Sequence, residues 1–459
     1  NGIQNIVLAG MGGSAIGGDV ARLLAKNELN IPMLVSRNYT LPNWVNKKTL
    51  VICSSYSGNT EESIAAFDQA REKGAQIIGI TTGGSLMEKM YDDRVKYKKL
   101  LIDEQKKGRA ADKNKLSQYY NLQVNLKIAL NSAYGAIGNQ YFRYYDVRQA
   151  MAITLAGQFI IRFIEQKVNE YLNKILQTEK KDYIVASDTD SIYVRFGKLV
   201  EKTCQGKSKE QIVDFLNKVC ENKLEPYIEK CFDELADYSN AFKNAMVMKR
   251  EVIADKGIWV AKKRYMLNVL DEEGIRLADP KLKLMGIEAV KSSTPEPCRN
   301  ALKKAFKIVM NGTEDDVIEY IEKFKGQFKS LSAEEVSFPR SVKGLSKYQD
   351  SVTVYRKSTP LHVKGSLIYN MMLKKNKLTK KYPIIQEGEK IKYTYLKEPN
   401  PSGDSAIAML TTLPKEFNLE EYIDYDRQFE KSFLDPMKGI LEKIGWDYEK
   451  KSTIMDFFS

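Results

Sequence analysis

The chain has 459 residues, 43% of them hydrophobic and 29% charged, which is enough for two to four globular domains. A single histidine excludes a His-based zinc site or a Ser-His-Asp triad, and five cysteines without CxxC spacing predict a reduced, cytoplasmic protein. The net charge is +13. Residues 1–90 hold 8 Lys and Arg against 7 Asp and Glu, so the basic surplus lies after residue 90. Such a surplus fits a protein that binds a polyanion, or a lysine-rich surface that keeps the protein soluble.

Residues 5–81 alternate between strand and helix patterns. Strands are predicted at 5–10, 31–36, 49–55 and 75–81, with helices at 14–26 and 60–73. This order predicts an α/β, doubly wound parallel sheet whose ligand loops follow the strands. Two such loops, GMGGS (10–14) and SSYSGNTEE (54–62), are rich in small residues that let backbone amides approach a phosphate.

These loops, together with ITTGG, resemble the sugar isomerase (SIS) domain of bifunctional phosphoglucose/phosphomannose isomerases over residues 1–88. The resemblance implies a phosphosugar site formed by Gly13, Ser14, Ser55, Ser57 and Thr60. The catalytic Glu, His and Lys of that family come from later in its chain, and nothing after residue 88 continues the pattern. We therefore expect a truncated SIS domain without isomerase activity, whose last strand has an unpaired edge.

From about residue 86 the pattern changes to an antiparallel helical hairpin, with helices over 87–109 and 116–138. Arg94 and Lys98 share one helix face, and Lys127, Asn131 and Tyr134 share another. A turn near residue 112 would place Lys98 and Lys127 at a similar height, about 21 Å up each helix. The three cations could then meet a triphosphate, although a solvated charged face is the alternative interpretation.

Residues 183–194, YIVASDTDSIYV, predict a hairpin with Asp188 and Asp190 at its tip. Paired carboxylates on rigid strands suit hard divalent cations such as Mg²⁺, but taken alone the motif could be a solvated turn. AKKRY (261–265), taken alone, could be a basic edge strand. Residues after 285 are predicted to be mostly helical with a few strands, and His362 is predicted to be structural.

RVKYK (94–98), KIALNSAYGAIGN (127–139), DTDS (188–191) and AKKRY follow one another in an order that resembles the family B DNA polymerases, most closely those of T-even-type bacteriophages. The likeness runs from about residue 86 to the C-terminus and includes 142–158 and 283–295. It implies an α+β region with fingers (89–140), palm (141–285) and thumb (286–459), after the SIS fragment (1–88).

The resemblance also implies a role for each motif residue. The incoming nucleotide's phosphates would be bound by Arg94, Lys98 and Lys127, and its base pair would lie beside Asn131, Tyr134 and Gly135. Asp190 would bind two catalytic Mg²⁺ ions directly, and Asp188 would tune their coordination. The primer-template duplex would meet Lys262, Lys263, Arg264 and Tyr265, with Lys263 also counted among the catalytic residues and Asp271 as a supporting residue. The reaction that the resemblance implies would be in-line attack of a primer 3′-hydroxyl on the α-phosphate of a dNTP.

The C-terminal segment KKSTIMDFFS resembles the sliding-clamp-binding peptide of these polymerases, with Ile454, Met455, Phe457 and Phe458 as anchors. A frayed terminus is the alternative interpretation. No signal peptide is evident, although Asn1 leaves a lost leader open, and no apolar run long enough to cross a membrane was identified. A location in the cytoplasm, of a host cell if the protein is viral, is expected.

Two family B features are missing from the sequence: the second metal-binding Asp, in a DxxSLYPS-like motif, and the exonuclease domain. One Mg²⁺ ligand set is therefore absent. The chain could be half of a split polymerase with a companion chain, an artificial or mis-assembled fusion, or a polymerase piece with an acquired phosphosugar sensor. We expect a DNA polymerase that is inactive in isolation. The alternative is a non-catalytic subunit that binds DNA and a sliding clamp.

Overall fold

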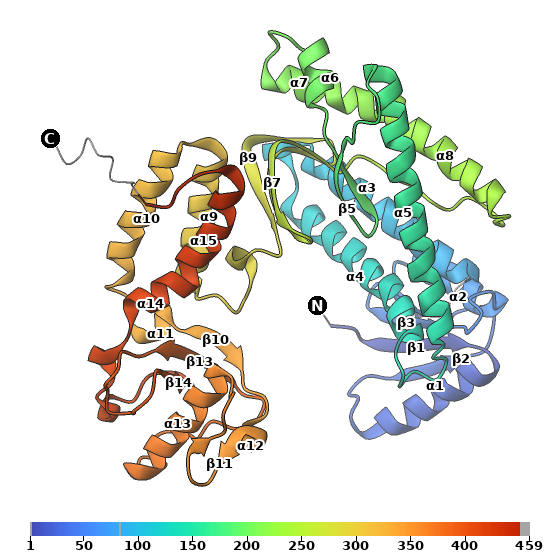
Figure 1. The fold of residues 1–459 in the computed structure, drawn as a ribbon. Coiled ribbons are helices and arrows are strands. Elements are labelled where there is room, and N and C mark those ends of the chain that lie inside the picture. The colour runs from blue at the N-terminus through green and yellow to red at the C-terminus, as the bar shows by residue number, and fades with distance from the viewer. Residues whose placement is uncertain (1, 82–83, 450–459) are drawn as a thin grey trace. The chain divides into compact units, whose positions relative to one another are not determined.

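The computed structural model describes residues 2–81 and 84–449 and divides into two compact units. Figure 1 labels most of their helices and strands. Unit 1 comprises residues up to 212 together with 218–249, and unit 2 comprises 213–217 together with residues from 250 onward. The segment expected to form one palm, 141–285, is thus divided between the two units.

The elements of unit 1 are β1 (Asn5–Gly10), α1 (Gly12–Leu24), β2 (Met33–Ser36), β3 (Thr49–Ser54), α2 (Glu61–Glu72), β4 (Gln76–Ile80), α3 (Gly84–Gln105), α4 (Lys113–Ile137), α5 (Val147–Leu176), β5 (Ile184–Asp188), β6 (Ser191–Val194), α6 (Gly197–Thr203) and α8 (Glu225–Tyr238). Helix α7 (Lys209–Val219) contributes residues to both units.

The elements of unit 2 are β7 (Val252–Ala261), β8 (Arg264–Glu272), β9 (Ile275–Met285), α9 (Glu296–Asn311), α10 (Glu314–Phe328), α11 (Ala333–Val336), β10 (Phe338–Ser341), α12 (Leu345–Tyr348), β11 (Gln349–Asp350), β12 (Val354–Tyr355), α13 (Leu361–Lys375), β13 (Lys390–Tyr395), β14 (Ala406–Met409), α14 (Tyr425–Phe429) and α15 (Asp435–Ile444). The prediction of a mostly helical C-terminal region with a few strands is confirmed.

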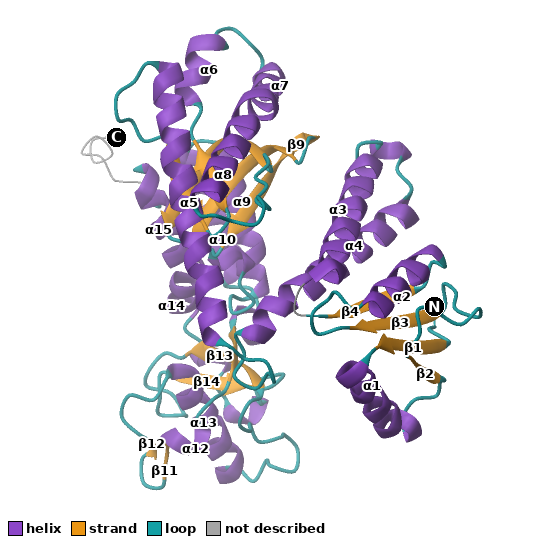
Figure 2. Ribbon diagram, turned by 90° about the vertical axis from the view of Figure 1, so that its right-hand side faces the viewer, coloured by secondary structure: helices purple, strands orange, loops and turns teal. Residues whose placement is uncertain are grey.

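The predicted parallel sheet is present, with strand order β2-β1-β3-β4. Figure 2 shows α1 on one face of this sheet and α2 on the other. Side-chain alternation along β1 explains both contacts, since Leu8 meets Gly18 of α1 while Val7 lies in the core that includes Phe67 of α2. Strand β4 is at an edge, as predicted.

Helix α3 begins directly after this sheet and completes its core. Leu86 and Met90 are buried with the strand residues of β1 and β3, and Leu126 and Leu130 of α4 pack against the same cluster. The base of the helical hairpin is therefore part of the hydrophobic core of the sheet. The two parts of the chain that the sequence separates at residue 88 share one core.

The β5–β6 hairpin is supported by the second half of α5 and by α8. Buried side chains from three elements make this core: Ile164, Val168 and Leu172 of α5, Ile184 of β5, and Ile228 and Phe232 of α8. The first half of α5 has no such cover, because residues 147–159 are exposed except for Ala150 and Gly157.

One helix in the described part of the chain, α5, is long and apolar enough to cross a membrane by length and composition, with 11% of its most apolar window buried. The expectation that no segment reaches this length and hydropathy was therefore wrong. Single polar residues interrupt the apolar residues of this helix, so no long continuous apolar run is visible in the sequence. One such helix is weak evidence of a membrane span.

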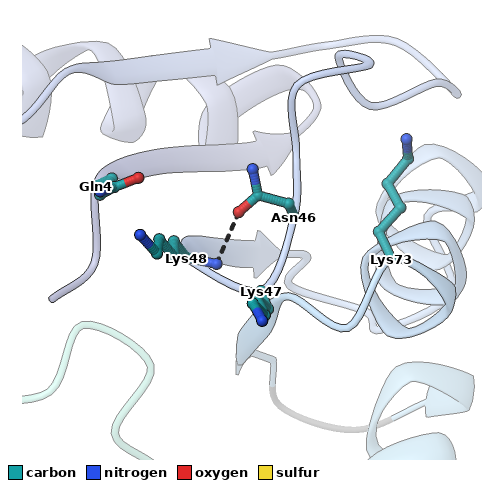
Figure 3. A pocket seen from close by; sticks show the side chains of 5 residues that line it. All are labelled: Gln4, Asn46, Lys47, Lys48 and Lys73. Atoms are coloured by element: carbon teal, nitrogen blue, oxygen red, sulfur yellow. Dashed lines mark hydrogen bonds between the residues drawn. The ribbon is translucent and has the colours of Figure 1, made fainter. Parts of the chain in front are cut away.

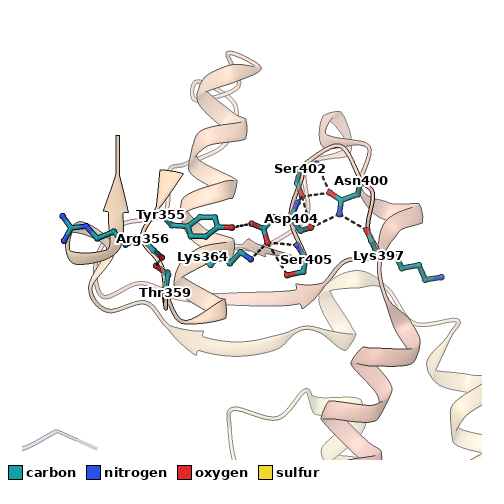
Figure 4. A network of polar contacts seen from close by, with 9 residues as sticks. All are labelled: Tyr355, Arg356, Thr359, Lys364, Lys397, Asn400, Ser402, Asp404 and Ser405. Carbon is teal, nitrogen blue, oxygen red and sulfur yellow. Dashed lines mark hydrogen bonds and ion pairs between the residues drawn. The ribbon is translucent and has the colours of Figure 1, made fainter. Parts of the chain in front are cut away.

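Unit 2 contains two cores. The first joins the β7-β8-β9 sheet to α9, α10 and α15, and includes Met266, Phe306 and Phe433. The second packs α13 against the β10-β13-β14 sheet. Figure 4 shows a polar network beside this second core, in which Asp404 accepts a hydrogen bond from Tyr355 and pairs with Lys364. This network joins the segment before α13 to the loop before β14.

The five cysteines are free and buried. Burial raises the pKa of the Cys53 thiol to about 12, which keeps it protonated and unreactive at neutral pH.

Candidate functional site

The two predicted metal-binding carboxylates lie at the tip of a tight hairpin. Asp188 pairs with Ser191 across the β5–β6 ladder, so only Thr189 and Asp190 form the turn. Thr189 adopts a left-handed conformation (φ 58°), and the Asp190 amide donates to the Asp188 carbonyl over 2.7 Å. Asp190 is exposed and Asp188 is half-buried. The hairpin thus presents Asp190 outward on a short, well-anchored tip.

These carboxylates fit only part of a two-metal site. Oxygen ligands on a rigid tip suit Mg²⁺, which completes its octahedron with water and phosphate oxygens. No cluster of three or more His, Cys, Asp or Glu side chains able to hold a metal occurs among the described residues. Asp188 and Asp190 could therefore hold a cation only together with groups from elsewhere.

The helical hairpin is confirmed, but its centre is nearer residue 108 than 112. The rings of Tyr97 and Tyr119 stack at 6.4 Å, which places these two residues at the same height. From that centre Lys98 lies 10 residues back and Lys127 lies 19 residues forward, a difference of about 13 Å along the helix axis. The prediction of equal height was wrong, because loop residues 106–111 were counted as helix.

The predicted shared faces of the hairpin are present. Lys127, Asn131 and Tyr134 are all exposed on α4. Arg94 on α3 is half-buried, and its Nε is buried without a hydrogen-bond partner among the described residues. An unpaired guanidinium N–H is costly unless an acceptor arrives, so Arg94 is suited to bind an anion.

Gly135 follows Tyr134 near the end of α4, and a Cβ there would meet no described atom within 4 Å. Packing within the chain therefore does not require glycine at this position. The Tyr134 hydroxyl lies 2.9 Å from that of Thr154 on α5, a contact that sequence reasoning missed.

The KKRY motif also lies on a hairpin. Lys262 and Lys263 form the two-residue turn between β7 and β8, with Lys263 left-handed (φ 59°), and both side chains are exposed. Tyr265, by contrast, is only 5% exposed, and its ring stacks on Trp259 at 6.1 Å. The expectation of a Tyr265 side chain offered to DNA is corrected: the ring packs within the sheet and supports the turn.

Arg264 is held by the segment that follows β9. Its guanidinium donates to Glu288 over 2.6 Å. Gly286 is left-handed (φ 64°), and a Cβ there would collide with the Lys263 carbonyl oxygen, so only glycine allows this approach. Sequence reasoning missed both residues, although a glycine between a strand and a charged turn is a signal of close packing.

Asp271 lies at the opposite end of β8 and is 3% exposed. It pairs with Arg250, contacts Arg276 at 3.5 Å and accepts from the Gly274 amide over 3.0 Å. These contacts tie the β8–β9 turn to the start of β7. Asp271 thus stabilises the β8–β9 turn within this sheet.

The predicted phosphosugar residues lie at one edge of the β1–β4 sheet. The register pairs Gly10 with Ser54, so the loops that follow β1 and β3 begin at the same level. Ser55 and Thr60 are joined by a 2.7 Å hydroxyl contact, and the Gly58 amide donates to Ser55 Oγ over 3.0 Å. Gly13 and Ser14 are in the first turn of α1.

This loop also contacts the start of the helical hairpin. The Leu86 amide donates to the Gly58 carbonyl over 2.9 Å, and the Ser85 amide donates to Asn59 Oδ1 over 2.9 Å. The Tyr56 ring lies 4.4 Å from that of Tyr144, which follows α4. The loop is therefore used in packing within unit 1.

A hollow of about 460 Å³ lies near the opposite edge of the sheet (Figure 3). It is lined by Gln4, Asn46, Lys47, Lys48 and Lys73. These residues precede β1, β3 and β4, whereas the predicted phosphosugar residues follow the strands. The hollow is thus separate from every site predicted from the sequence. The predicted clamp anchors Ile454, Met455, Phe457 and Phe458 lie outside the described residues.

Comparison with known proteins gives two matches along the chain. The sequence model for DNA polymerase family B matches residues 77–444, and the SIS domain model matches residues 2–99. The two overlap over residues 77–99, which include β4 and the start of α3. The overlap includes Leu86 and Met90, which belong to the core that joins the sheet to the hairpin.

Individual relatives agree with both matches. The chain is 40% identical to the DNA-directed DNA polymerases of Enterobacteria phage T4 and Escherichia phage RB69, over 72% and 73% of its own length. It spans 38% of the length of each of these relatives. Over 86 residues it is 55% identical to the bifunctional phosphoglucose/phosphomannose isomerase of Caldicellulosiruptor bescii, covering 19% of this chain and 25% of that protein.

Proposed function

This chain belongs to DNA polymerase family B, and from that premise we propose that it is the part of a DNA polymerase that binds the incoming dNTP and supplies the ligands on one side of the catalytic metal site. The observation that carries the proposal is the DTDS hairpin, whose two-residue turn holds Asp190 exposed beside Asp188. The phage T4 and RB69 relatives are DNA-directed DNA polymerases, and the chain spans 38% of the length of each.

We propose fingers, palm and thumb regions at 89–140, 141–285 and 286–459. Arg94, Lys98 and Lys127 bind the nucleotide's phosphates, and the Arg94 Nε without a partner supports this assignment. The different heights of Lys98 and Lys127 mean that an extended triphosphate lies along the hairpin rather than across it. Asn131, Tyr134 and Gly135 lie beside the nascent base pair, where open space at Gly135 leaves room for a base.

Asp190 and Asp188 would hold Mg²⁺, which supplies charge stabilisation for phosphoryl transfer when bound. The exposed side chains of Lys262 and Lys263, at the turn of their hairpin, contact the primer-template backbone. Arg264, fixed by Glu288, orients that turn, and Asp271 supports its strand. Lys263 adds positive charge to the surface that meets the duplex.

One carboxylate pair does not complete a two-metal site, because Mg²⁺ tolerates little distortion and needs ligands on more than one side. We therefore propose that the remaining ligand comes from a segment equivalent to the part of the relatives that this chain does not span. Without it, the chain binds DNA and nucleotide but does not catalyse synthesis.

A second candidate function is a non-catalytic subunit that binds DNA and, through residues 454–458, a sliding clamp. The overall charge of +13 favours this candidate as much as the first. For the SIS fragment we propose phosphosugar binding by Gly13, Ser14, Ser55, Ser57 and Thr60 without isomerisation.

Primer extension tests the proposal. The full chain alone should bind primer-template DNA with an affinity that falls steeply with salt, because several Lys and Arg contact phosphates. It should incorporate no nucleotide and should not interconvert glucose 6-phosphate and fructose 6-phosphate. Synthesis should appear when a polypeptide corresponding to the uncovered part of the phage T4 relative is added.

The outcomes separate the two candidates. Extension that depends on the added polypeptide supports the polymerase. DNA binding without extension, in a complex that has formed, supports the binding subunit. Robust extension by the chain alone would contradict the missing ligand and would require another carboxylate at the site.

A further inference from the structure

Three lysines line the hollow at the edge of the sheet where β1, β3 and β4 begin (Figure 3). Its volume of about 460 Å³ is within the roughly 300–1,000 Å³ of pockets that hold small ligands. Lys47, Lys48 and Lys73 share its lining with the carboxamides of Gln4 and Asn46. Among the described residues that line it, none is acidic and none is aromatic. The hollow therefore concentrates positive charge without a carboxylate to offset it.

Most other basic side chains of residues 1–90 pair with carboxylates. Four of the other five form ion pairs: Arg22, Arg37, Arg71 and Lys89. By contrast, no carboxylate oxygen among the described residues lies within 4.0 Å of the ammonium of Lys47, Lys48 or Lys73. Like charges that share a small space repel one another, and an anion between them removes this cost. The lysines that this region leaves without ion pairs are therefore concentrated at the hollow.

The loop that carries Lys47 and Lys48 is fixed by its own hydrogen bonds. Asn46 Oδ1 accepts from the Lys48 amide over 2.8 Å, and Asn46 Nδ2 donates to the Trp44 carbonyl over 3.0 Å. The Gln4 amide donates to the Lys48 carbonyl over 2.8 Å, which ties the loop to the start of β1. The backbone positions of both lysines are thus set before a ligand binds, which lowers the conformational entropy lost on binding.

Lys73 reaches the same hollow from the end of α2. Its amide donates to the Gln69 carbonyl over 3.0 Å, and the next residue, Gly74, is left-handed (φ 67°), so the helix ends here. The helix dipole favours a lysine at this end, but it does not explain Lys47 and Lys48 on the neighbouring loop. Two separate elements therefore bring cations to one place.

The chemistry of the lining selects among anions. A strand of nucleic acid is usually held by aromatic side chains on which its bases stack, and the described lining has none. A single phosphate group carries at most about two negative charges, fewer than the three ammonium groups carry. A linked diphosphate or triphosphate carries roughly three or more charges in one short chain, and the Gln4 carboxamide can donate to its oxygens.

We propose that the hollow is a binding site for a linked diphosphate or triphosphate, either free in solution or part of a nucleotide, held by Lys47, Lys48 and Lys73. The site lies near the opposite edge of the sheet from the loops proposed to bind a phosphosugar. It contains none of the residues proposed to bind the phosphates of a dNTP. The inference therefore does not rest on the proposed function.

Calorimetry with tripolyphosphate in Mg²⁺-free buffer tests the site. Every chain carries Lys127→Ala, so that binding at the proposed nucleotide site is weakened throughout. Adding Lys47→Gln, Lys48→Gln should weaken binding at least about tenfold, because two of three charge-assisted contacts are lost. The matched control adds Lys303→Gln, Lys304→Gln, two adjacent exposed lysines of α9, and should change nothing. Equal binding by both sets, or no binding before either is added, overturns the proposal.

Lysine acetylation with limiting reagent locates the probe in the unsubstituted full chain. Mass spectrometry should show that saturating tripolyphosphate lowers acetylation of Lys47, Lys48 and Lys73 severalfold. Lys26, an exposed lysine of the same region, should be acetylated as before. Equal protection of all four lysines would mean general screening by the anion and would overturn the proposal. This measurement needs no substitution, so a folding defect cannot imitate its result.

Competition against bound tripolyphosphate identifies the source of the phosphates. Displacement by pyrophosphate but not by a dNTP supports a free ligand, and displacement by both supports a site that also accepts a nucleotide. Glucose 6-phosphate should not displace the probe, since displacement would place the probe at the phosphosugar loops and overturn the proposal. Displacement by single-stranded oligo(dT) alone would assign the hollow to nucleic acid and would also overturn it.

Discussion

The Tyr134 phenol donates a hydrogen bond to the Thr154 hydroxyl over 2.9 Å, and this joins the end of α4 to the exposed half of α5. The donor can be assigned because the Thr154 hydroxyl itself lies 2.9 Å from the Ala150 carbonyl, to which it donates. The hydrogen bond to α5 thereby fixes the orientation of the Tyr134 side chain. The space beside the next residue, Gly135, stays open, because no described atom lies within 4 Å of a Cβ there.

Gly135→Ala should reduce nucleotide insertion without reducing stability. A Cβ at this position meets no described atom within 4 Å, and alanine is favoured over glycine in a helix by about 1 kcal/mol. Urea unfolding should therefore show equal or higher stability, while single-turnover insertion by the reconstituted complex falls. Gly326→Ala on α10, where space is also open, is the matched control and should leave insertion unchanged.

Lys127→Ala should raise the nucleotide KM or lower kcat severalfold and leave primer-template affinity almost unchanged. The lysine is exposed on the face it shares with Asn131, so the substitution removes a phosphate contact and little packing. Steady-state extension and fluorescence anisotropy measure the two quantities. Lys113→Ala, at the other end of α4, controls for net charge. Equal loss of duplex affinity would place Lys127 on the DNA path instead.

Asp190→Asn should abolish synthesis by the reconstituted complex, whereas Asp188→Asn should cause a smaller loss. Asp190 is exposed at the hairpin tip, and loss of its charge weakens a Mg²⁺ site that already depends on few ligands. Extension rates against Mg²⁺ concentration measure the effect, and Asp103→Asn on the exposed side of α3 is the control. Undiminished extension by Asp190→Asn would refute the metal assignment.

His362 should make unit 2 less stable as the pH falls below about 6.5. Burial, and then the charge of Arg340, lowers the pKa of this histidine below its usual value of 6.5. In that window the unfolded chain binds more protons than the folded chain, so the free energy of unfolding decreases as pH falls. Urea unfolding at pH 7.5 and 5.5 should show a smaller decrease for His362→Gln than for the unsubstituted chain. Identical slopes would mean that the imidazole titrates normally.

The Lys364–Asp404 ion pair should contribute far more to the free energy of unfolding than an exposed ion pair does. Its side chains are 20% and 7% exposed, so Asp404→Ala leaves a poorly solvated ammonium and should cost about 3 kcal/mol. The Lys329–Asp426 pair has a normal 2.9 Å separation but side chains that are 53% and 61% exposed. Asp426→Ala should therefore cost less than about 1 kcal/mol. Equal costs, measured by urea unfolding, would contradict the role of burial.

Local sequence patterns predicted most of the individual elements. The β1–β4 sheet, the helical hairpin and the DTDS turn follow from apolar periodicity and from short turns, which depend on neighbouring residues. The height of Lys127 depended on where α3 ends, and boundaries are set by weak, competing capping signals. The burial of Tyr265 depends on how the β7-β8-β9 sheet packs on the helices of its core, and the pairing of Arg264 with Glu288 joins residues on either side of β9. A local pattern of apolar and turn residues reveals neither.

The sharing of α3 between the sheet and the hairpin limits how α3 and α4, the helices that we propose bind the nucleotide, can move. Detaching Leu86 and Met90 from the sheet would expose two buried side chains at a cost of roughly 3–6 kcal/mol, well above thermal energy. The hairpin and the β1–β4 sheet would therefore rotate together as one rigid body. Alternatively, α3 would have to bend beyond Met90. The mass and hydrodynamic drag of the sheet would thus become part of any rotation of the hairpin.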